Sequence, residues 1–145
     1  LGVKRLAIAT PYNASLTGLL QTYLEEAHVE VVSSHYLDRE SGIARVSYEA
    51  VRYLASMVDR PEAEAIFFSC TNLRTFDILE ELEFILGKPV LSGNQVMMWA
   101  ALSMAGFELP ELNQSLFPSR EPIIATTRFN TPVNGQPTPG SLVSG

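Results

Sequence analysis

The feature that most constrains the fold of this chain is a repeated alternation between short apolar runs and longer amphipathic segments. The apolar runs, which are typical of buried strands, fall at residues 6–9, 29–33, 64–69 and 89–91. The segments that follow them predict helices at residues 14–27, 47–58, 75–87 and 96–104. Strands that alternate with helices over short connections require right-handed crossovers and a parallel sheet. The sequence therefore predicts an α/β fold with a doubly wound, Rossmann- or flavodoxin-like parallel sheet of four strands.

Polar residues and a glycine mark the ends of the predicted helices. Asn13, Ser47 and Thr75 can each accept a hydrogen bond from the first helical N–H groups. Gly87 tolerates the left-handed conformation that ends many helices. In the helix that Thr75 begins, the expected apolar positions are Phe76, Leu79, Leu82, Phe84 and Ile85. We expect its acidic residues to lie on a solvated face, namely Asp77, Glu80, Glu81 and Glu83.

The last predicted helix is apolar nearly all round, with Val96, Met97, Met98, Trp99, Ala100, Ala101, Leu102 and Met104. Such a helix must be buried on several sides, which implies a covering surface from another domain or subunit. From Pro110 onward the composition changes, because six of the nine prolines fall in this region. We expect an α/β domain over residues 1–108 and a Pro/Gly-rich extended tail over 109–145, in which only 122–127 resembles a strand.

Composition argues against several classes of function. A net charge of −6 and a pI near 4.9 disfavour nucleic-acid binding, since phosphate contacts need clustered Lys and Arg. No apolar run is long enough to cross a bilayer and no signal peptide is visible, so we predict no membrane partner and a cytoplasmic location. His28 and His35 stand apart from other metal ligands, and no phosphate-binding glycine motif is present. We therefore predict neither a metal nor another cofactor.

Cys70, the only cysteine, is the residue at which chemistry is most strongly indicated. It comes shortly after the apolar run 65–68, at the carboxyl end of a buried strand, where open parallel sheets bind ligands. The unpaired N–H groups of the helix expected next would favour a thiolate and a bound carboxylate. The alternative interpretation is that Cys70 is a small buried hydrophobic residue, the commonest fate of a free cysteine.

Neutral polar side chains are expected around this thiol, because they follow the other strands at the same edge of the sheet. They are Thr10, Tyr12, Asn13, Ser41, Ser69, Thr71, Asn72 and Asn94. Neutral donors and acceptors around one thiol suit a reaction at carbon. The sequence thus predicts a small carboxylate as the ligand.

Three stretches carry a family resemblance. They are 9–12 (Ala-Thr-Pro-Tyr), 69–75 (Ser-Cys-Thr-Asn-Leu-Arg-Thr) and 87–95 (Gly-Lys-Pro-Val-Leu-Ser-Gly-Asn-Gln), with Trp99 after the last of them. In order and content, residues 3–107 resemble the C-terminal half of maleate cis-trans isomerases and the related ectoine-utilisation proteins. These belong to the aspartate/glutamate racemase superfamily, which also includes hydantoin racemases and arylmalonate decarboxylase.

The resemblance implies a fold of two similar halves, with the site between them and one cysteine typically supplied by each half. Racemases of this superfamily use two thiols on opposite faces of the substrate carbon, and maleate isomerases add a thiolate to the double bond. The decarboxylase protonates an enediolate with one cysteine, in the half that this chain resembles. By the same resemblance, Cys70 is an acid/base thiol, Tyr12 binds substrate, and the N–H groups of Thr71 and Asn72 hold a carboxylate.

Departures from the family pattern leave several hypotheses open. The first half and its cysteine are absent, so the start at Leu1 is expected to fall inside a longer protein. No asparagine stands near Ser41, where isomerases use one. Ser41 and Asn13, which lie among the polar residues at the strand ends, are further candidates for binding substrate. The chain is then an isomerase- or racemase-type domain for a dicarboxylate such as maleate or for an amino-acid-type substrate, completed by its other half or by a homodimer. A single-cysteine decarboxylase and a noncatalytic carboxylate-binding module are the alternatives.

Overall fold

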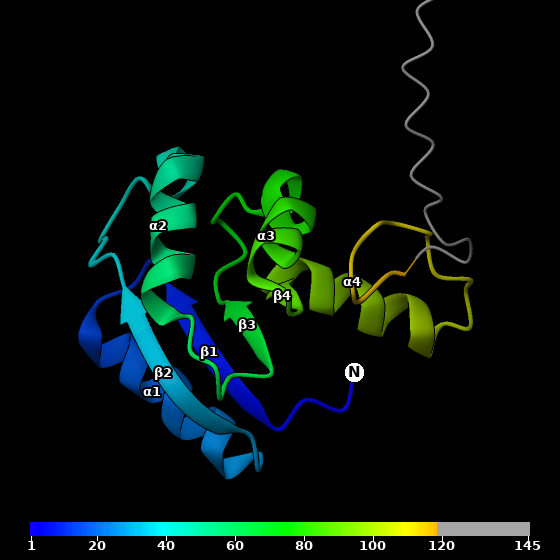
Figure 1. The fold of residues 1–145 in the computed structure, drawn as a ribbon, viewed down its shortest axis with the longest axis horizontal. Coiled ribbons are helices and arrows are strands. Elements are labelled where there is room, and N and C mark those ends of the chain that lie inside the picture. Colours follow the sequence, from blue (N-terminus) through cyan, green and yellow to red (C-terminus); the bar gives the residue numbers. More distant parts are fainter. Residues whose placement is uncertain (119–145) are drawn as a thin grey trace, which may run out of the picture.

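The computed structural model describes residues 1–118, which form a parallel sheet with helices on both faces (Figure 1). The strands are β1 (Arg5–Thr10), β2 (Glu30–Tyr36), β3 (Ala65–Phe68) and β4 (Val90–Ser92), in the spatial order β2-β1-β3-β4. The helices are α1 (Ala14–Glu26), α2 (Tyr48–Val58), α3 (Leu79–Leu86) and α4 (Gly93–Met104), with 3-10 turns η1 (Ile43–Arg45) and η2 (Phe76–Ile78). The predicted α/β class and four parallel strands are confirmed. Within residues 1–118, no helix is long and apolar enough to cross a bilayer.

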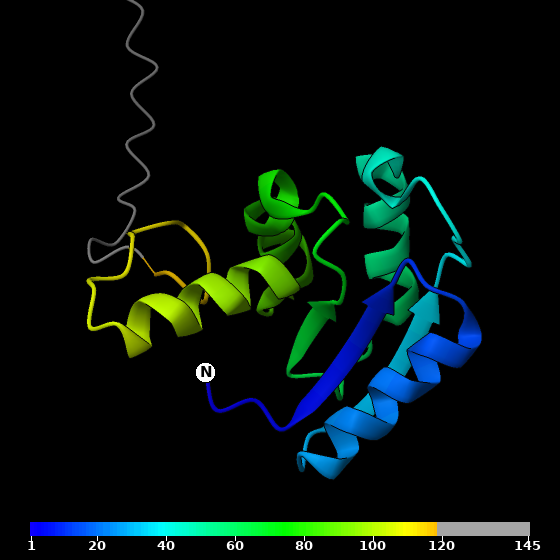
Figure 2. The ribbon, with the colours of Figure 1, turned by 180° about the vertical axis from the view of Figure 1, so that it is seen from behind.

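The two faces of the sheet are covered differently. The larger core lies between the sheet and α2 with α3, and it includes Ala9, Leu54, Phe68 and Leu79. On the opposite face, α1 covers β1 and β2 (Figure 2). Leu6 and Ile8 are buried there, with Leu20 and Leu24 of α1 packed against them. All the strands are parallel, so their carboxyl ends meet at one edge of the sheet, as the location of the predicted site requires.

The helix ends predicted at Asn13, Ser47 and Gly87 are confirmed. The Asn13 side chain accepts a hydrogen bond from the Leu16 N–H at 3.0 Å, and the Ser47 hydroxyl accepts one from the Ala50 N–H at 3.3 Å. Gly87 ends α3 with φ of 65°, in the left-handed region. These local contacts hold the starts of α1 and α2 at the same edge of the sheet as Cys70.

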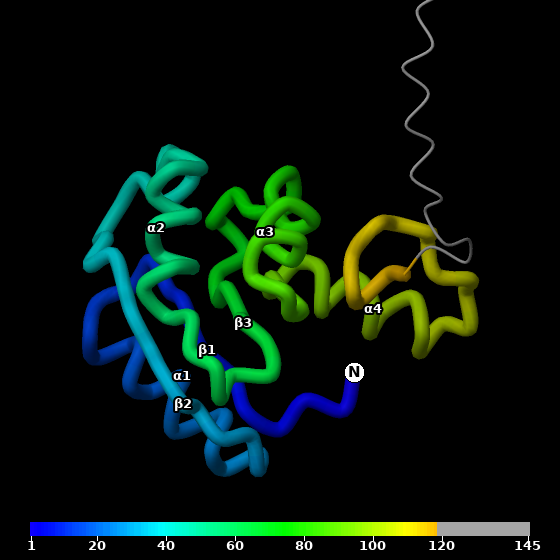
Figure 3. The backbone as a smooth tube through the Cα atoms, viewed as in Figure 1, coloured from blue at the N-terminus to red at the C-terminus, as the bar shows by residue number. Residues whose placement is uncertain are grey.

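The helix predicted to begin at Thr75 begins later, and this expectation is wrong. Thr75 makes no capping hydrogen bond, η2 follows it, and α3 starts only at Leu79. The segment between β3 and α3 runs between α2 and α3 in the tube of Figure 3. The tighter turn places Ile78 and Leu79 in the core, whereas Phe84 is 89% exposed. Ile78 is therefore buried, whereas Phe76, Phe84 and Ile85, which the spacing predicted to be buried, are all exposed.

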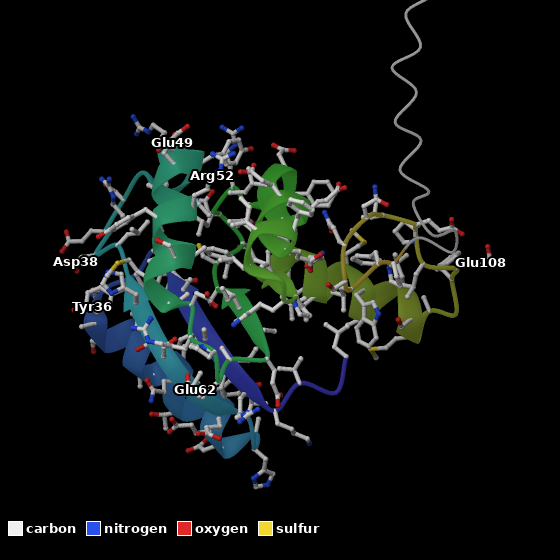
Figure 4. All side chains as sticks on the ribbon, in the orientation of Figure 1. Tyr36, Asp38, Glu49, Arg52, Glu62 and Glu108 are labelled. Carbon is white, nitrogen blue, oxygen red and sulfur yellow. The ribbon has the colours of Figure 1, made fainter. Side chains whose placement is uncertain are left out.

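Two of the acidic residues expected on a solvated face, Glu81 and Glu83, instead contact other parts of the fold. Arg52, labelled on α2 in Figure 4, forms an ion pair with Glu81 on α3 at 2.7 Å. The Glu83 carboxylate accepts hydrogen bonds from the backbone N–H groups of Val90 at 3.0 Å and Ser115 at 2.8 Å. Glu83 therefore joins α3 to β4 and to the segment after α4.

Part of the predicted tail packs onto the domain. Gln114 and Phe117 are buried, and the Gln95 side chain of α4 donates a hydrogen bond to that of Gln114. The remainder of the tail, including the possible strand at 122–127, lies outside the described residues. The division of the chain at residue 108 stays a prediction.

The apolar face of α4 is exposed in this chain. Met97, Met98 and Met104 are 57%, 55% and 89% exposed, and only Gln95 of the helix is buried. Figure 2 shows α4 leading away from the sheet, whereas α1 lies along it. Most apolar side chains of α4 are therefore not covered by other parts of the chain within residues 1–118.

Candidate functional site

Cys70 lies two residues beyond β3 in an unusual backbone conformation. The Ser69 N–H still donates to the carbonyl of Ala9 at 3.0 Å, which continues the pairing with β1 up to the cysteine. Cys70 itself has φ of 134° and is half-buried. A turn then closes through the Leu73 N–H, which donates to the Cys70 carbonyl at 3.3 Å. A side chain at this φ costs about 1–3 kcal/mol, so the surrounding contacts impose the conformation.

Tyr12, two residues beyond the end of β1, lies beside this thiol. Burial raises the pKa of Tyr12, and the side chain of Cys70 raises it further by hydrogen bonding and by charge. Ser69 acts in the opposite direction, since its hydrogen bond lowers the pKa of Tyr12. The phenol therefore keeps its proton at neutral pH and can donate it to the sulfur or to a ligand oxygen.

The residues after the cysteine present free donors. Thr71 and Asn72 are exposed, and within residues 1–118 their backbone N–H groups have no hydrogen-bond partner. The Asn94 side chain donates to the Thr71 carbonyl at 2.9 Å. A Cβ placed on Gly93 would lie 3.8 Å from the Cys70 nitrogen. The start of α4 thus lies against Cys70. The sequence predicted instead the start of the helix that directly follows Cys70.

The other two candidates, Asn13 and Ser41, form no hydrogen bond with Cys70 among the described residues. The Asn13 side-chain oxygen accepts the capping hydrogen bond of α1, and Asn13 is exposed. Ser41 is also exposed, in the loop between β2 and η1. That loop lies near Tyr12, because the Asp38 N–H donates to the Tyr12 carbonyl at 3.0 Å. Substrate binding by Asn13 or Ser41 stays a prediction.

An open pocket of about 300 Å³ adjoins the loop after Cys70. It is lined by Thr71, Asn72 and Asn94 together with three side chains that sequence reasoning did not select, namely Tyr48, Arg74 and Asp77. Arg74 was visible inside the motif, but Tyr48 reaches the pocket from α2. Only the position of Tyr48 at the start of α2, at the carboxyl edge of the sheet, could have indicated its place in the pocket.

The arrangement can bind an anion and move a proton. Unpaired N–H groups and a protonated phenol can hold carboxylate oxygens, and a thiol beside them can exchange a proton with an adjacent carbon. Within residues 1–118, no group of three His, Cys, Asp or Glu side chains could hold a metal ion.

Comparisons with known proteins agree with this fold. The sequence profile of the arylmalonate decarboxylase family matches residues 1–116. The arylmalonate decarboxylase of Bordetella bronchiseptica is 32% identical over 114 residues, which cover 73% of this chain and 46% of that protein. The fold and sequence thus define a protein of the aspartate/glutamate racemase superfamily, as the resemblance implied. The chain belongs to the arylmalonate decarboxylase family.

Solved structures of related proteins share the fold of this chain. A crystal structure of arylmalonate decarboxylase superposes with a TM-score of 0.73 at 29% identity, over 81% of this chain and 54% of that one. The maleate isomerase Iso(C200A) from Pseudomonas putida S16 with maleate has a TM-score of 0.76 at 21% identity, over 82% of this chain and 49% of that one. The second likeness concerns the fold alone. The chain spans about half the length of the relatives it matches.

Proposed function

We propose that this chain supplies a carboxylate-binding half-site in which Cys70 transfers a proton to or from a carbon next to the bound carboxylate. The observation that carries this proposal is the position of Tyr12 beside Cys70, where the cysteine side chain contributes to the raised pKa of the phenol. The free N–H groups of Thr71 and Asn72 support it, because they directly follow the thiol.

Each group has a role in this proposal. Removal of a proton or of carbon dioxide beside a carboxylate places negative charge on the carboxylate oxygens, as an enediolate. The Tyr12 hydroxyl and the N–H groups of Thr71 and Asn72 would stabilise that charge, as preorganised donors do in other enzymes. The Cys70 thiol would exchange the proton at carbon.

Family membership favours a decarboxylase among the possible reactions. In that reaction the bond between the α-carbon and one carboxylate breaks, carbon dioxide leaves, and the electron pair remains in the enediolate. The Cys70 thiol gives its proton to the α-carbon, and the thiolate regains a proton from water. One thiol is sufficient for this sequence. Cis-trans isomerisation of maleate and racemisation of an amino-acid-type substrate are the second proposal, supported by the fold shared with maleate isomerase.

A deuterium experiment tests the proposal. An aryl(methyl)malonate is incubated with the full chain in heavy water, and we expect carbon dioxide and a 2-arylpropionate with one deuterium at the α-carbon. Cys70→Ala should abolish both, whereas Ser56→Ala, on the exposed side of α2, should not. Turnover that persists in Cys70→Ala would refute the role of the thiol. Carboxylate binding that survives Cys70→Ser, together with no turnover in the parent, would instead identify a noncatalytic binding module.

A protein surface over α4 is part of the same proposal. The exposed Met97, Met98 and Met104 support either a second copy of this chain or the other half of a two-half protein as the cover. Sedimentation of the chain at micromolar concentration distinguishes them, because a monomer would rule out the homodimer. A cytoplasmic location is also proposed, and cell fractionation would test it.

A further inference from the structure

The first turn of α4 is joined to the segment after this helix by a buried hydrogen bond. The Gln95 Nε2 donates to the side-chain oxygen of Gln114, and the two residues are only 4% and 7% exposed. Within residues 1–118, Gln95 is the only buried residue of α4, so its amide has little access to water as another partner. Loss of either side chain would therefore leave the other buried without its partner.

This hydrogen bond sets the direction in which the Gln95 amide faces. With its nitrogen toward Gln114, the amide turns its oxygen to the backbone, where it accepts the Ser92 N–H at 3.4 Å. The Ser92 hydroxyl accepts the Gln95 N–H at 3.3 Å, and the two bonds together form the reciprocal cap that begins α4. Gln114 thus supports the start of a helix that ends before Gln114 in the sequence.

The start of α4 in turn holds the loop that carries the thiol. The Asn94 side chain donates to the Thr71 carbonyl at 2.9 Å, and a Cβ added to Gly93 would lie 3.8 Å from the Cys70 nitrogen. Cys70 has a strained φ of 134°, which persists only while its surroundings impose it. A less rigid start of α4 would let the loop relax, and the thiol would move relative to Tyr12.

We infer that Gln114 is a positioning residue for Cys70, which acts through Gln95 and the first turn of α4. Gln114 belongs to the region that composition assigned to a tail, so a segment outside the predicted domain supports the site. The effect on the loop is independent of the reaction, whereas the effect on turnover rests on the proposed function. Displacement of a reacting group by about 1 Å can slow a reaction about a hundredfold.

Hydrogen exchange of single amides in the full chain tests the link. The Leu73 N–H reports on the loop, because it closes the turn by donating to the Cys70 carbonyl at 3.3 Å. The Ile8 N–H, in β1, is the reference for overall stability. Gln114→Leu removes the acceptor, and we expect exchange at Leu73 to rise about tenfold relative to exchange at Ile8.

Two further variants show whether the effect follows this route. In Gln95→Leu, which removes the donor, Gln114→Leu should cause no additional rise in the ratio of exchange at Leu73 to exchange at Ile8. Leu24→Ala is the control for lost stability alone, because Leu24 packs on the opposite face of the sheet, and it should leave the ratio unchanged. An unchanged ratio in Gln114→Leu, an equal rise in Leu24→Ala, or an additional rise in the double variant overturns the positioning role.

Turnover separates this inference from the proposed function. In the deuterium assay, Gln114→Leu should convert the aryl(methyl)malonate at least about tenfold more slowly than the parent chain, whereas Leu24→Ala should match the parent. Circular dichroism at the assay temperature checks that each variant is folded. Parent-like turnover in Gln114→Leu overturns the positioning role. Absence of turnover in the parent refutes the proposed function, and the exchange ratio then decides whether Gln114 holds the loop.

Discussion

The backbone strain at Cys70 leads to a prediction that reverses the usual order of two substitutions. Cys70→Ala and Cys70→Gly both delete the thiol, but only glycine adopts φ of 134° without a steric cost. Relief of that strain is worth about 1–3 kcal/mol. Glycine loses about 0.5–1 kcal/mol through the greater freedom of the unfolded chain. We therefore expect Cys70→Gly to be more stable than Cys70→Ala by about 1 kcal/mol.

Urea denaturation followed by circular dichroism measures this difference as the free energy of unfolding. Ala27→Gly is the matched control, because Ala27 is exposed and has φ of −82°, where alanine is unstrained. We expect this control to be destabilised by about 0.5–1 kcal/mol. The reasoning about strain is wrong if Cys70→Gly proves less stable than Cys70→Ala by the same amount as the control.

Three further predictions concern stability. The pKa of Tyr12 is raised in the folded chain, so the unfolded chain loses this proton first as the pH rises through about 10. The free energy of unfolding therefore falls in that pH range. Urea titrations across pH should show a smaller fall in Tyr12→Phe than in the parent chain. Glu83→Gln weakens the charge-assisted hydrogen bonds to two backbone N–H groups and should cost about 1–2 kcal/mol in thermal or urea unfolding, whereas the exposed Glu80→Gln should be nearly neutral. His28 has φ of 63° just after α1, so His28→Gly should raise the free energy of unfolding by about 0.5–1 kcal/mol and the urea midpoint with it; an unchanged midpoint would contradict this.

The order of elements could be predicted because it depends on local patterns. Runs such as 65–68 are too short and too apolar for an exposed helix, and polar caps at Asn13 and Ser47 fix where helices begin. The end of the third helix at Gly87 was predicted correctly, but its start and three of its buried positions were not, because its apolar residues are more numerous than its buried positions. Spacing alone did not show that Ile78 enters the core while Phe84 faces solvent.

The residues of the site likewise fall into those that local sequence indicates and those that only the fold brings together. Cys70, Thr71 and Asn72 could be located from the rule that ligands bind at the carboxyl ends of parallel strands. The pairing of Arg74 with Tyr48 joins residues 26 positions apart, and no local pattern indicates it. The strained φ of Cys70 is likewise a product of contacts on both sides of the loop, from β1 through Ala9 and from α4 through Asn94.

These contacts also connect the exposed helix α4 with the loop that carries Cys70. The first turn of α4 contacts the Cys70 loop, through the Asn94 side chain on Thr71 and through Gly93 near the Cys70 nitrogen. The rest of the same helix presents exposed methionines, including Met98 and Met104. Because the same helix contacts the loop, we expect a surface that covers those methionines to restrain the loop that carries the thiol as well. Covering α4 should therefore slow exchange of the amide hydrogens of the loop as well as those of the helix, whereas a loop that is independent of α4 would show no such change.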